Sequence, residues 1–203
     1  MRKAKAFLLI LFFGFTLLYA QEEDPPKDGG EWDIYDTESY TRGDQTFIIS
    51  LGTVFPTIFL NNGKKISSNF DPPVGGAGVL SYNYFFNPNI FLGGEVGGSF
   101  MPTLGKNMYY TILLGVRSGY QFHYWRLEFP LNLTVGMIWQ RYLDNRYYGL
   151  YMKAGGSVYY RFTSEWSFGL TSNWYWIPQW TNDHKKNVDG NMVDLLLSAR
   201  YHF

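Results

Sequence analysis

The sequence predicts an all-β fold, an eight-stranded antiparallel up-and-down transmembrane β-barrel. Three observations predict it: apolar and polar residues alternate along eight segments, aromatic residues gather at the segment ends, and the polar positions hold mostly small residues. The segment RLEFPLNLTVGMIW (residues 126–139) shows the alternation most clearly, since its odd positions from Leu127 to Trp139 are all apolar. A period of two is that of a strand whose two faces have different surroundings.

The composition fits a chain rich in strands and turns. Of the 203 residues, 20% are aromatic, only 17% are charged and 22 are glycine. The absence of cysteine excludes disulfides, structural zinc sites held by thiolates, and thiol nucleophiles. The formal net charge of zero hides an acidic stretch at residues 21–45, where nine Asp and Glu stand against two Lys and Arg.

The N-terminal part of the chain differs from the barrel. Residues 1–20 begin with MRKAK and continue as an apolar run, which is the layout of a secretory signal peptide cleaved after Ala20. The alternative is an uncleaved membrane anchor, because Leu18 stands where a small residue is usual. Residues 21–45 are too acidic and too poor in aliphatics to bury a core, so we expect a flexible periplasmic extension. The barrel then occupies residues 46–203.

Eight strands are expected, joined by connections of alternating length. The strands cover residues 46–56, 75–86, 90–100, 108–122, 125–140, 147–163, 166–178 and 191–203. Short turns such as residues 164–165 alternate with longer loops such as residues 57–74. Turns at one rim and loops at the other are typical of an up-and-down barrel with both ends on one side. Pro130 lacks an N–H for the ladder, and we expect a β-bulge there.

The two faces of the strands differ in composition. On the apolar face, aliphatic residues occupy the strand centres and aromatic residues the ends, for example Phe122 at the turn rim and Trp139 at the loop rim. A lipid bilayer sorts side chains by depth in this way. The opposite face holds mainly Gly, Ser, Thr and Asn, whereas a soluble lipocalin-type barrel, the alternative, would carry many Lys and Glu outside. We therefore expect lipid outside the barrel and a polar lumen inside it.

The chain resembles the small eight-stranded outer-membrane barrels of the OmpX, OmpW and OmpA-transmembrane type. The resemblance rests on GAGVLSYNYFFNPNIFLGGEVG (residues 76–97), LLGVRSGYQF (113–122) and LLLSARYHF (195–203). It implies that the last strand, with Tyr201 and Phe203, carries the signal read by the barrel-assembly machinery. It also implies export to the cell outer membrane, with the loops outside and both termini periplasmic.

Two sets of residues are expected in the lumen. The first is a charge network of Glu95, Arg117, Arg126, Glu128, Lys153, Arg161, Asp194 and Arg200. The second is an apolar throat of Val54, Leu113, Ile138, Tyr151, Tyr175 and Ile177. Paired charges can fill an eight-stranded interior, which is just wide enough for side chains. An apolar throat above a charged base would instead favour small hydrophobic molecules over ions.

The expected function is that of a porin-like passive conduit for small, mainly hydrophobic solutes, as resemblance to OmpW-like barrels implies. The alternative is a non-conducting surface or structural protein with a plugged lumen, involved in adhesion or envelope integrity. Catalysis is not expected, because no serine is evident beside His123, His184 or His202. Neither a metal, a cofactor nor a nucleic-acid partner is expected. The expected partners are outer-membrane lipid, the assembly machinery during insertion, and small hydrophobic solutes.

Overall fold

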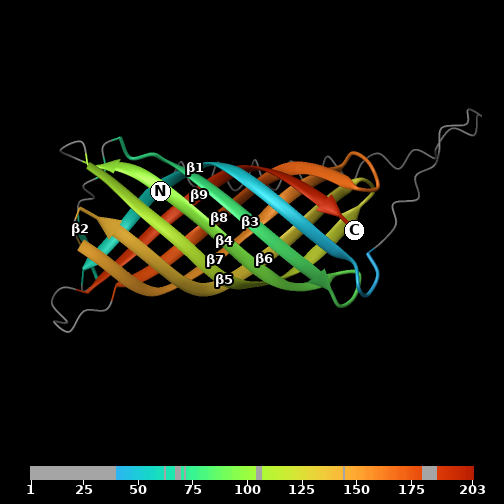
Figure 1. The fold of residues 1–203 in the computed structure, drawn as a ribbon, viewed down its shortest axis with the longest axis horizontal. Helices are drawn as coiled ribbons and strands as arrows, with labels where there is room; N and C mark the ends of the chain where they lie inside the picture. The colour runs from blue at the N-terminus through green and yellow to red at the C-terminus, as the bar shows by residue number, and fades with distance from the viewer. Residues whose placement is uncertain are drawn as a thin grey trace, which may run out of the picture. The chain divides into compact units, whose positions relative to one another are not determined.

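The computed structural model describes residues 40–61, 63–66, 70, 72–103, 107–143, 145–179 and 187–203, which form a closed antiparallel β-barrel (Figure 1). Its strands are β1 (Gln45–Asn61), β2 (Lys64–Ile66), β3 (Gly75–Phe85), β4 (Ile90–Thr103), β5 (Asn107–Tyr124), β6 (Leu127–Tyr142), β7 (Asn145–Arg161), β8 (Trp166–Gln179) and β9 (Val188–His202). From β3 to β9 each strand pairs with the next, and β1 pairs with both β3 and β9. The barrel itself therefore has eight strands and no open edge, as predicted.

The predicted strand boundaries differ from the observed ones most at the end of β1. We expected a loop over residues 57–74, but β1 continues to Asn61 and Lys64–Ile66 pairs back along it as β2. Gly63, with a φ of +77°, lies in the turn of this hairpin. Part of the expected loop therefore forms a β-hairpin that extends the sheet beyond the barrel.

The prediction of a β-bulge at Pro130 is wrong. Pro130 stands opposite Gln121 in an unbroken register with β5, and the ladder to β7 keeps one register on both sides of Phe129 and Pro130. These two residues have no partner in β7, so the missing N–H interrupts the ladder without shifting it. The irregularity lies in β1 instead, where the register with β9 shifts between Pro56 and Ile58.

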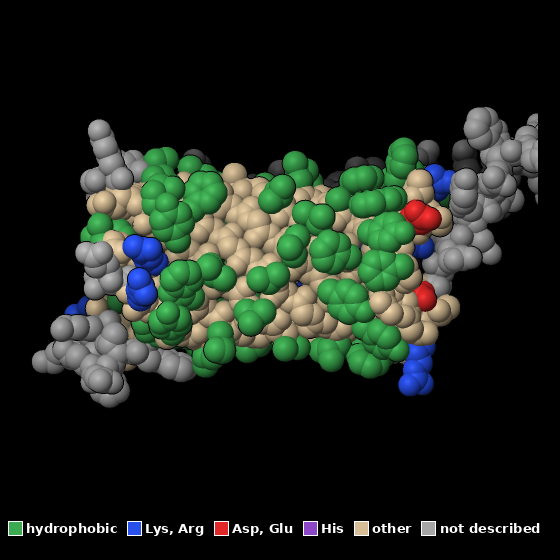
Figure 2. Space-filling model, in the orientation of Figure 1, with side chains coloured by type: hydrophobic (Ala, Val, Ile, Leu, Met, Phe, Trp, Pro, Cys, Tyr) green, Lys and Arg blue, Asp and Glu red, His purple; other side chains and the backbone are tan. Residues whose placement is uncertain are grey.

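The outer and inner faces of the strands follow the predicted alternation. On β6, Leu131 is 54% exposed, whereas the next residue, Asn132, is 5% exposed. Hydrophobic side chains spread over the outer face of the barrel (Figure 2). Phe122 near the turn rim and Tyr110 near the loop rim are both exposed. An apolar surface of this extent fits hydrocarbon and not water, so the barrel is a transmembrane barrel. Among the described residues, no helix has the length and apolar character needed to span a membrane.

The depth of a lipid-facing residue should decide how much a charge costs there. Leu114 lies near the middle of β5 and is 64% exposed, so Leu114→Arg should lower the free energy of unfolding by about 2–4 kcal/mol. Tyr110→Arg, on the same face near the loop rim, should cost only about 0–1 kcal/mol. Urea unfolding in phosphatidylcholine vesicles, followed by tryptophan fluorescence, measures both. Equal costs at the two positions would contradict a bilayer around this face.

Candidate functional site

The lumen holds three layers of side chains. The turn-side cluster is Glu128, Arg161 and Arg200; the mid-lumen cluster is Glu95, Arg117 and Lys153; and the apolar cluster is Val54, Met101, Tyr109, Leu113, Ile138, Tyr151, Tyr175, Ile177 and Met192. Every second residue of a strand points inward, so one strand contributes to several layers. On β5, the inward residues run from Tyr109 and Leu113 on the loop side through Arg117 to Gln121 on the turn side.

The mid-lumen cluster places one buried carboxylate between two cations. Glu95 on β4 forms an ion pair with Lys153 on β7, and Arg117 Nη1 lies 3.6 Å from Glu95 Oε2. Arg117 also donates from Nη1 to Ser81 Oγ (3.2 Å) and from Nη2 to Asn132 Oδ1 (3.0 Å). Because all three charged side chains are buried, loss of one would leave the others poorly compensated.

Asp194 is held by neutral groups rather than by an ion pair among the described residues. Its carboxylate accepts hydrogen bonds from the backbone N–H of Asn173 (2.7 Å), from Asn173 Nδ2 (3.0 and 3.1 Å) and from the Tyr175 hydroxyl. Asn132 Nδ2 donates to Asn173 Oδ1 (3.1 Å). Since Asn132 also binds Arg117, a chain of hydrogen bonds joins Asp194 to the mid-lumen cluster.

The turn-side cluster surrounds a second buried carboxylate. Glu128 accepts from Arg200 and from Gln121 Nε2 (2.8 Å), and Arg161 Nε lies 2.8 Å from its Oε1. Arg200 also donates from Nη1 to Gln121 Oε1 (3.0 Å), and its guanidinium lies 4.1 Å from the ring centre of Tyr159. Contact with an aromatic face stabilises a cation that has left water. The Arg200 guanidinium is therefore stabilised within the barrel by Glu128, Gln121 and the Tyr159 ring.

Tyr40 lies in the turn-side end of the lumen, ahead of β1. Its side chain is only 3% exposed. The hydroxyl donates to Glu128 Oε2 (3.0 Å) and is hydrogen-bonded with His202 Nδ1 (2.9 Å). The ring stacks on Phe85 with centroids 4.0 Å apart, and the Arg161 guanidinium lies 5.0 Å from its centre. Tyr40 thus packs into the barrel as a core residue does.

The segment that carries Tyr40 has defined local structure. The Thr41 N–H donates to Asp44 Oδ2 (2.7 Å), and the Gly43 N–H donates to the carbonyl of Phe85 (2.9 Å). This differs from the flexible extension predicted for residues 21–45. Residues 1–39, which include the predicted signal peptide and most of that extension, lie outside the described residues.

The apolar cluster fills the loop-side half of the lumen. It contains all six residues of the predicted throat, together with Met101, Tyr109 and Met192. A cavity of about 10 Å³ lies among its side chains, which is roughly the space for the centre of one water molecule. On the loop side of this cluster, the Tyr109 hydroxyl donates to Gln140 Oε1 (2.6 Å). The throat is therefore packed with side chains in this structure.

The predicted charge network divides into separate groups. Glu95, Arg117 and Lys153 come together in one cluster, and Glu128, Arg161 and Arg200 in another. Asp194 is linked to the first cluster through the amides of Asn173 and Asn132 and through Tyr175, whose ring centre lies 5.4 Å from Lys153 Nζ. Arg126 was wrongly placed in the lumen. It lies in the turn between β5 and β6, where its guanidinium is 5.7 Å from the ring centre of Trp125. The strand before it runs two residues further than predicted, which moves the turn to Trp125 and Arg126.

Phe203 closes the seam between the first and last strands. Its N–H donates to the carbonyl of Gln45 (3.1 Å) and its carbonyl accepts from the Gln45 N–H (2.9 Å). The Tyr201 and Phe203 rings lie 5.4 Å apart, and Phe203 is exposed on the outer face. Both residues stand at the turn rim; their role as an assembly signal stays a prediction.

A serine does lie beside a histidine, which the sequence did not indicate. Ser167 Oγ is 2.7 Å from His202 Nε2, although the two residues are far apart in the chain. Ser167 is fully buried in this structure, so its hydroxyl is not exposed to solvent beside the histidine. His123 bonds with Gln121, and His184 lies outside the described residues. Within the described part of the chain, no three His, Asp or Glu side chains are grouped to hold a metal ion.

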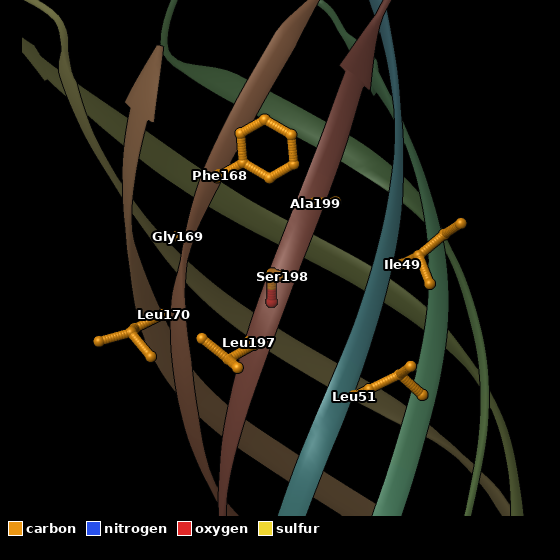
Figure 3. Close-up of a pocket in the computed structure, with 8 residues that line it drawn as sticks. All are labelled: Ile49, Leu51, Phe168, Gly169, Leu170, Leu197, Ser198 and Ala199. Atoms are coloured by element: carbon orange, nitrogen blue, oxygen red, sulfur yellow. The ribbon is translucent and has the colours of Figure 1, made fainter. Parts of the chain in front are cut away.

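A hollow of about 660 Å³ lies on the outer face of the barrel, not in the lumen (Figure 3). It is bordered by Ile49 and Leu51 of β1, Phe168 and Leu170 of β8, and Leu197 of β9. The small Ala199 side chain forms its floor between Phe168 and Ile49. The side chains around the hollow are mainly apolar, like those on the rest of the outer face.

A closed antiparallel barrel with an apolar exterior and an ion-paired interior defines a small β-barrel protein of the outer-membrane type. Residues 22–201 match a protein-family model that carries no functional description, and the chain belongs to that family. The matched residues include part of the acidic stretch ahead of the barrel. The family thus comprises more than the barrel strands.

The sequence relatives come from Treponema pallidum (strain Nichols) and are uncharacterised proteins. One is 33% identical over 142 residues, which covers 70% of this chain and 62% of the relative. Another is 32% identical over 142 residues, which covers 62% of this chain and 49% of the relative. The chain therefore spans between about half and two thirds of the length of these relatives.

Among solved structures, Neisserial surface protein A has a similar fold. The TM-score is 0.56 at 11% sequence identity, and the match covers 79% of this chain and 97% of the other. At this identity the likeness shows the fold alone. The predicted fold class, an eight-stranded antiparallel transmembrane β-barrel, is confirmed.

Removal of the mid-lumen carboxylate should destabilise the barrel. Glu95→Gln leaves Lys153 and Arg117 buried without their anion and should cost about 3–5 kcal/mol of unfolding free energy. Adding Lys153→Met should recover part of the loss, because it removes one uncompensated cation. Glu165→Gln, in an exposed turn, should change stability by less than about 0.5 kcal/mol. Urea unfolding in micelles measures all three; a Glu95→Gln protein as stable as the control would contradict the cluster.

Tyr40 should contribute to stability through both its hydroxyl and its ring. Tyr40→Phe removes two hydrogen bonds, one of them to the Glu128 carboxylate, and should cost about 2–4 kcal/mol. Tyr40→Ala also removes the ring stacked on Phe85 and should cost about 3–5 kcal/mol. Tyr124→Phe, on an exposed side chain, is the matched control and should be neutral. Urea unfolding in micelles measures the three variants. An unchanged free energy of unfolding in Tyr40→Ala would mean that the segment ahead of β1 does not pack into the barrel.

Proposed function

We propose that this chain is an integral outer-membrane protein whose closed lumen is a structural core, so that it acts through its membrane-facing and rim surfaces. In this proposal the protein is non-conducting and serves envelope integrity or contact at the cell surface. The filling of the lumen is the observation that carries the proposal. The three layers described above leave a cavity of only about 10 Å³ in the apolar cluster.

The buried ion pairs support a structural lumen. A solute that crossed the barrel would have to separate Glu95 from Lys153 and Arg117, and then Glu128 from Arg200. Each separation would leave charges in a site with few other partners, which is costly. Tyr40 adds a further obstacle, because its ring lies between Phe85 and the Arg161 guanidinium at the turn-side end.

The proposed placement of the protein follows the sequence patterns. The apolar run of residues 1–20 would direct export and be removed, and residues 21–39 would extend into the periplasm from the turn rim. The β1–β2 hairpin and the other long connections would then face outward. Outer-membrane lipid is the partner that this placement requires, and the assembly machinery is the partner proposed for insertion.

A porin-like conduit for small hydrophobic solutes is the second candidate. One observation favours it: the lumen is divided into an apolar half on the loop side and a charged half on the turn side. Met101 and Met192, which are flexible side chains, belong to the apolar half. Conduction would require Tyr151 and Tyr175 to leave their buried positions and the ion pairs to rearrange.

Conductance of the full chain in planar lipid bilayers separates the two candidates. The closed barrel predicts that the bilayers show no channel currents. Insertion is verified by recovering folded protein from the vesicles used to deliver it to the bilayer. Liposomes that contain the protein should also fail to swell in small uncharged solutes. Steady openings that shift in Arg117→Ala, but not in the exposed rim variant Lys64→Ala, would overturn the proposal and support the conduit.

A further inference from the structure

Two arginines stand directly opposite each other on the outer face of the loop rim. Arg141 of β6 pairs in register with Arg146 of β7, and both are exposed. Arg141 also stands opposite Tyr110 of β5. Arg141 shares the parity of Trp139 and Met137, which point outward on β6. Arg146 shares the parity of Tyr148 and Leu150, which point outward on β7, so both arginine side chains leave the barrel on its lipid-facing side.

Like charges in directly opposed positions repel each other across a strand pair. Among the described residues, no ion pair involves Arg141 or Arg146. Arg141 donates from Nε to the carbonyl of Leu143 (3.4 Å), which holds its side chain along the hairpin. The pair therefore concentrates positive charge at one point of the rim, and an anion between the two guanidinium groups would relieve the repulsion.

The outward-facing cross-strand pairs of β6 and β7 become less polar from the arginines toward the centre of the barrel. The next outward pair toward the centre is Trp139 and Tyr148, whose rings lie nearly parallel with centroids 6.4 Å apart. The following pair is Met137 and Leu150, both well exposed. The sequence of cationic, aromatic and aliphatic rows matches the depth profile of one amphipathic molecule, with its charge at the rim and its chains against the strands.

We propose that Arg141 and Arg146 bind the phosphate group of a membrane lipid whose acyl chains lie over the Trp139–Tyr148 and Met137–Leu150 rows. The planar guanidinium group suits phosphate, since it can donate two parallel hydrogen bonds to it. A free phosphate fits less well, because the two arginines are exposed at the rim and only the lipid uses the apolar rows. The inference rests on the proposed position of the barrel in the outer membrane, with this rim at a bilayer surface.

The other exposed cations of the loop rim differ in arrangement. Lys64 and Lys65 are neighbours along β2, so their side chains point to opposite faces of the strand and do not converge. The strand pairs only with the end of β1, beyond the barrel wall. Lys and Arg side chains are visible on this end of the molecule in Figure 2. Lys64 and Lys65 therefore provide a matched control with the same charge at the same rim.

Native mass spectrometry of the full chain in micelles of a neutral detergent tests the site. The probes are phosphatidic acid, whose headgroup is a phosphate monoester, and phosphatidylcholine with the same acyl chains. The protein should retain phosphatidic acid at least about tenfold more strongly than phosphatidylcholine. The double variant R141Q/R146Q should lose most of this preference, by roughly tenfold. The control K64Q/K65Q should retain phosphatidic acid within about twofold of the unchanged protein.

Three results would overturn the proposal. One is equal retention of phosphatidic acid by the protein and R141Q/R146Q, with folding of both verified by circular dichroism. Another is an equal loss in K64Q/K65Q, which would indicate general charge attraction. The third is displacement of the lipid by an equal concentration of inorganic phosphate, which would make the site one for free phosphate. None of these results depends on whether the lumen conducts.

Asp144 lies between the two arginines in the sequence and outside the described residues. A third variant, D144N, therefore tests whether this carboxylate affects lipid binding. Removing a nearby acid should leave phosphatidic acid retention equal or stronger, because it raises the net positive charge at the site. Weaker retention in D144N would mean that the carboxylate organises the arginines and would contradict a site made by two guanidinium groups.

Discussion

A lipid bilayer offers no hydrogen bonds to a peptide group, and the rest of the structure depends on this constraint. Every strand of the barrel must have partners on both sides, which the pairing of β1 with β9 completes. Closure in turn leaves each strand with one row of side chains in hydrocarbon and one row in a narrow lumen. Leu131 is exposed and Asn132 is buried because of this division, and the remaining barrel strands show the same alternation of exposed and buried residues.

The narrow lumen explains the chemistry found inside it. Polar residues keep the inner face distinct from the outer one, but an eight-stranded barrel has little room for water to solvate them. The buried carboxylates Glu95 and Glu128 are therefore compensated by cations and amides from several strands. Tyr40 extends the same principle to the segment before β1, because its hydroxyl is one more donor to Glu128. The interior resembles a polar protein core more than a channel, which is the basis for proposing a function at the outer surface and the rims.

The fold followed from the sequence because its signal repeats on every strand. Period-two alternation and the depth sorting of aromatic residues predicted the closed barrel and the direction of the side chains, including the six throat residues. Partners within the lumen were harder to predict, because they depend on the shear of the barrel, which brings Glu95 to Lys153 across several strands. Gln121 and Asn132 were missed as partners of the charged residues, although they share the inward parity. That parity was the available signal.

Local errors arose where single residues decide the geometry. Arg126 was assigned to a strand because it continued the alternation of residues 126–139, but the preceding strand runs on to Tyr124 and puts Arg126 in the turn. Tyr40 lies in an acidic stretch whose composition favours disorder. Composition cannot predict that a single aromatic side chain packs against Glu128 and Phe85 at the turn-side end of the lumen. The Arg141–Arg146 pair depends on the hairpin register, which fixes opposed positions that sequence spacing alone leaves open.

The division between hydrocarbon and a packed lumen is tested most directly by accessibility along one strand. The chain has no cysteine, so single cysteines at Leu131, Asn132, Leu133 and Thr134 can each carry a nitroxide label in lipid vesicles. Labels at Leu131 and Leu133 should collide readily with oxygen, which concentrates in hydrocarbon, and poorly with a water-soluble nickel complex. Labels at Asn132 and Thr134 should be protected from both reagents. Nickel access at the two leucines, or an absence of alternation along the four positions, would contradict the account.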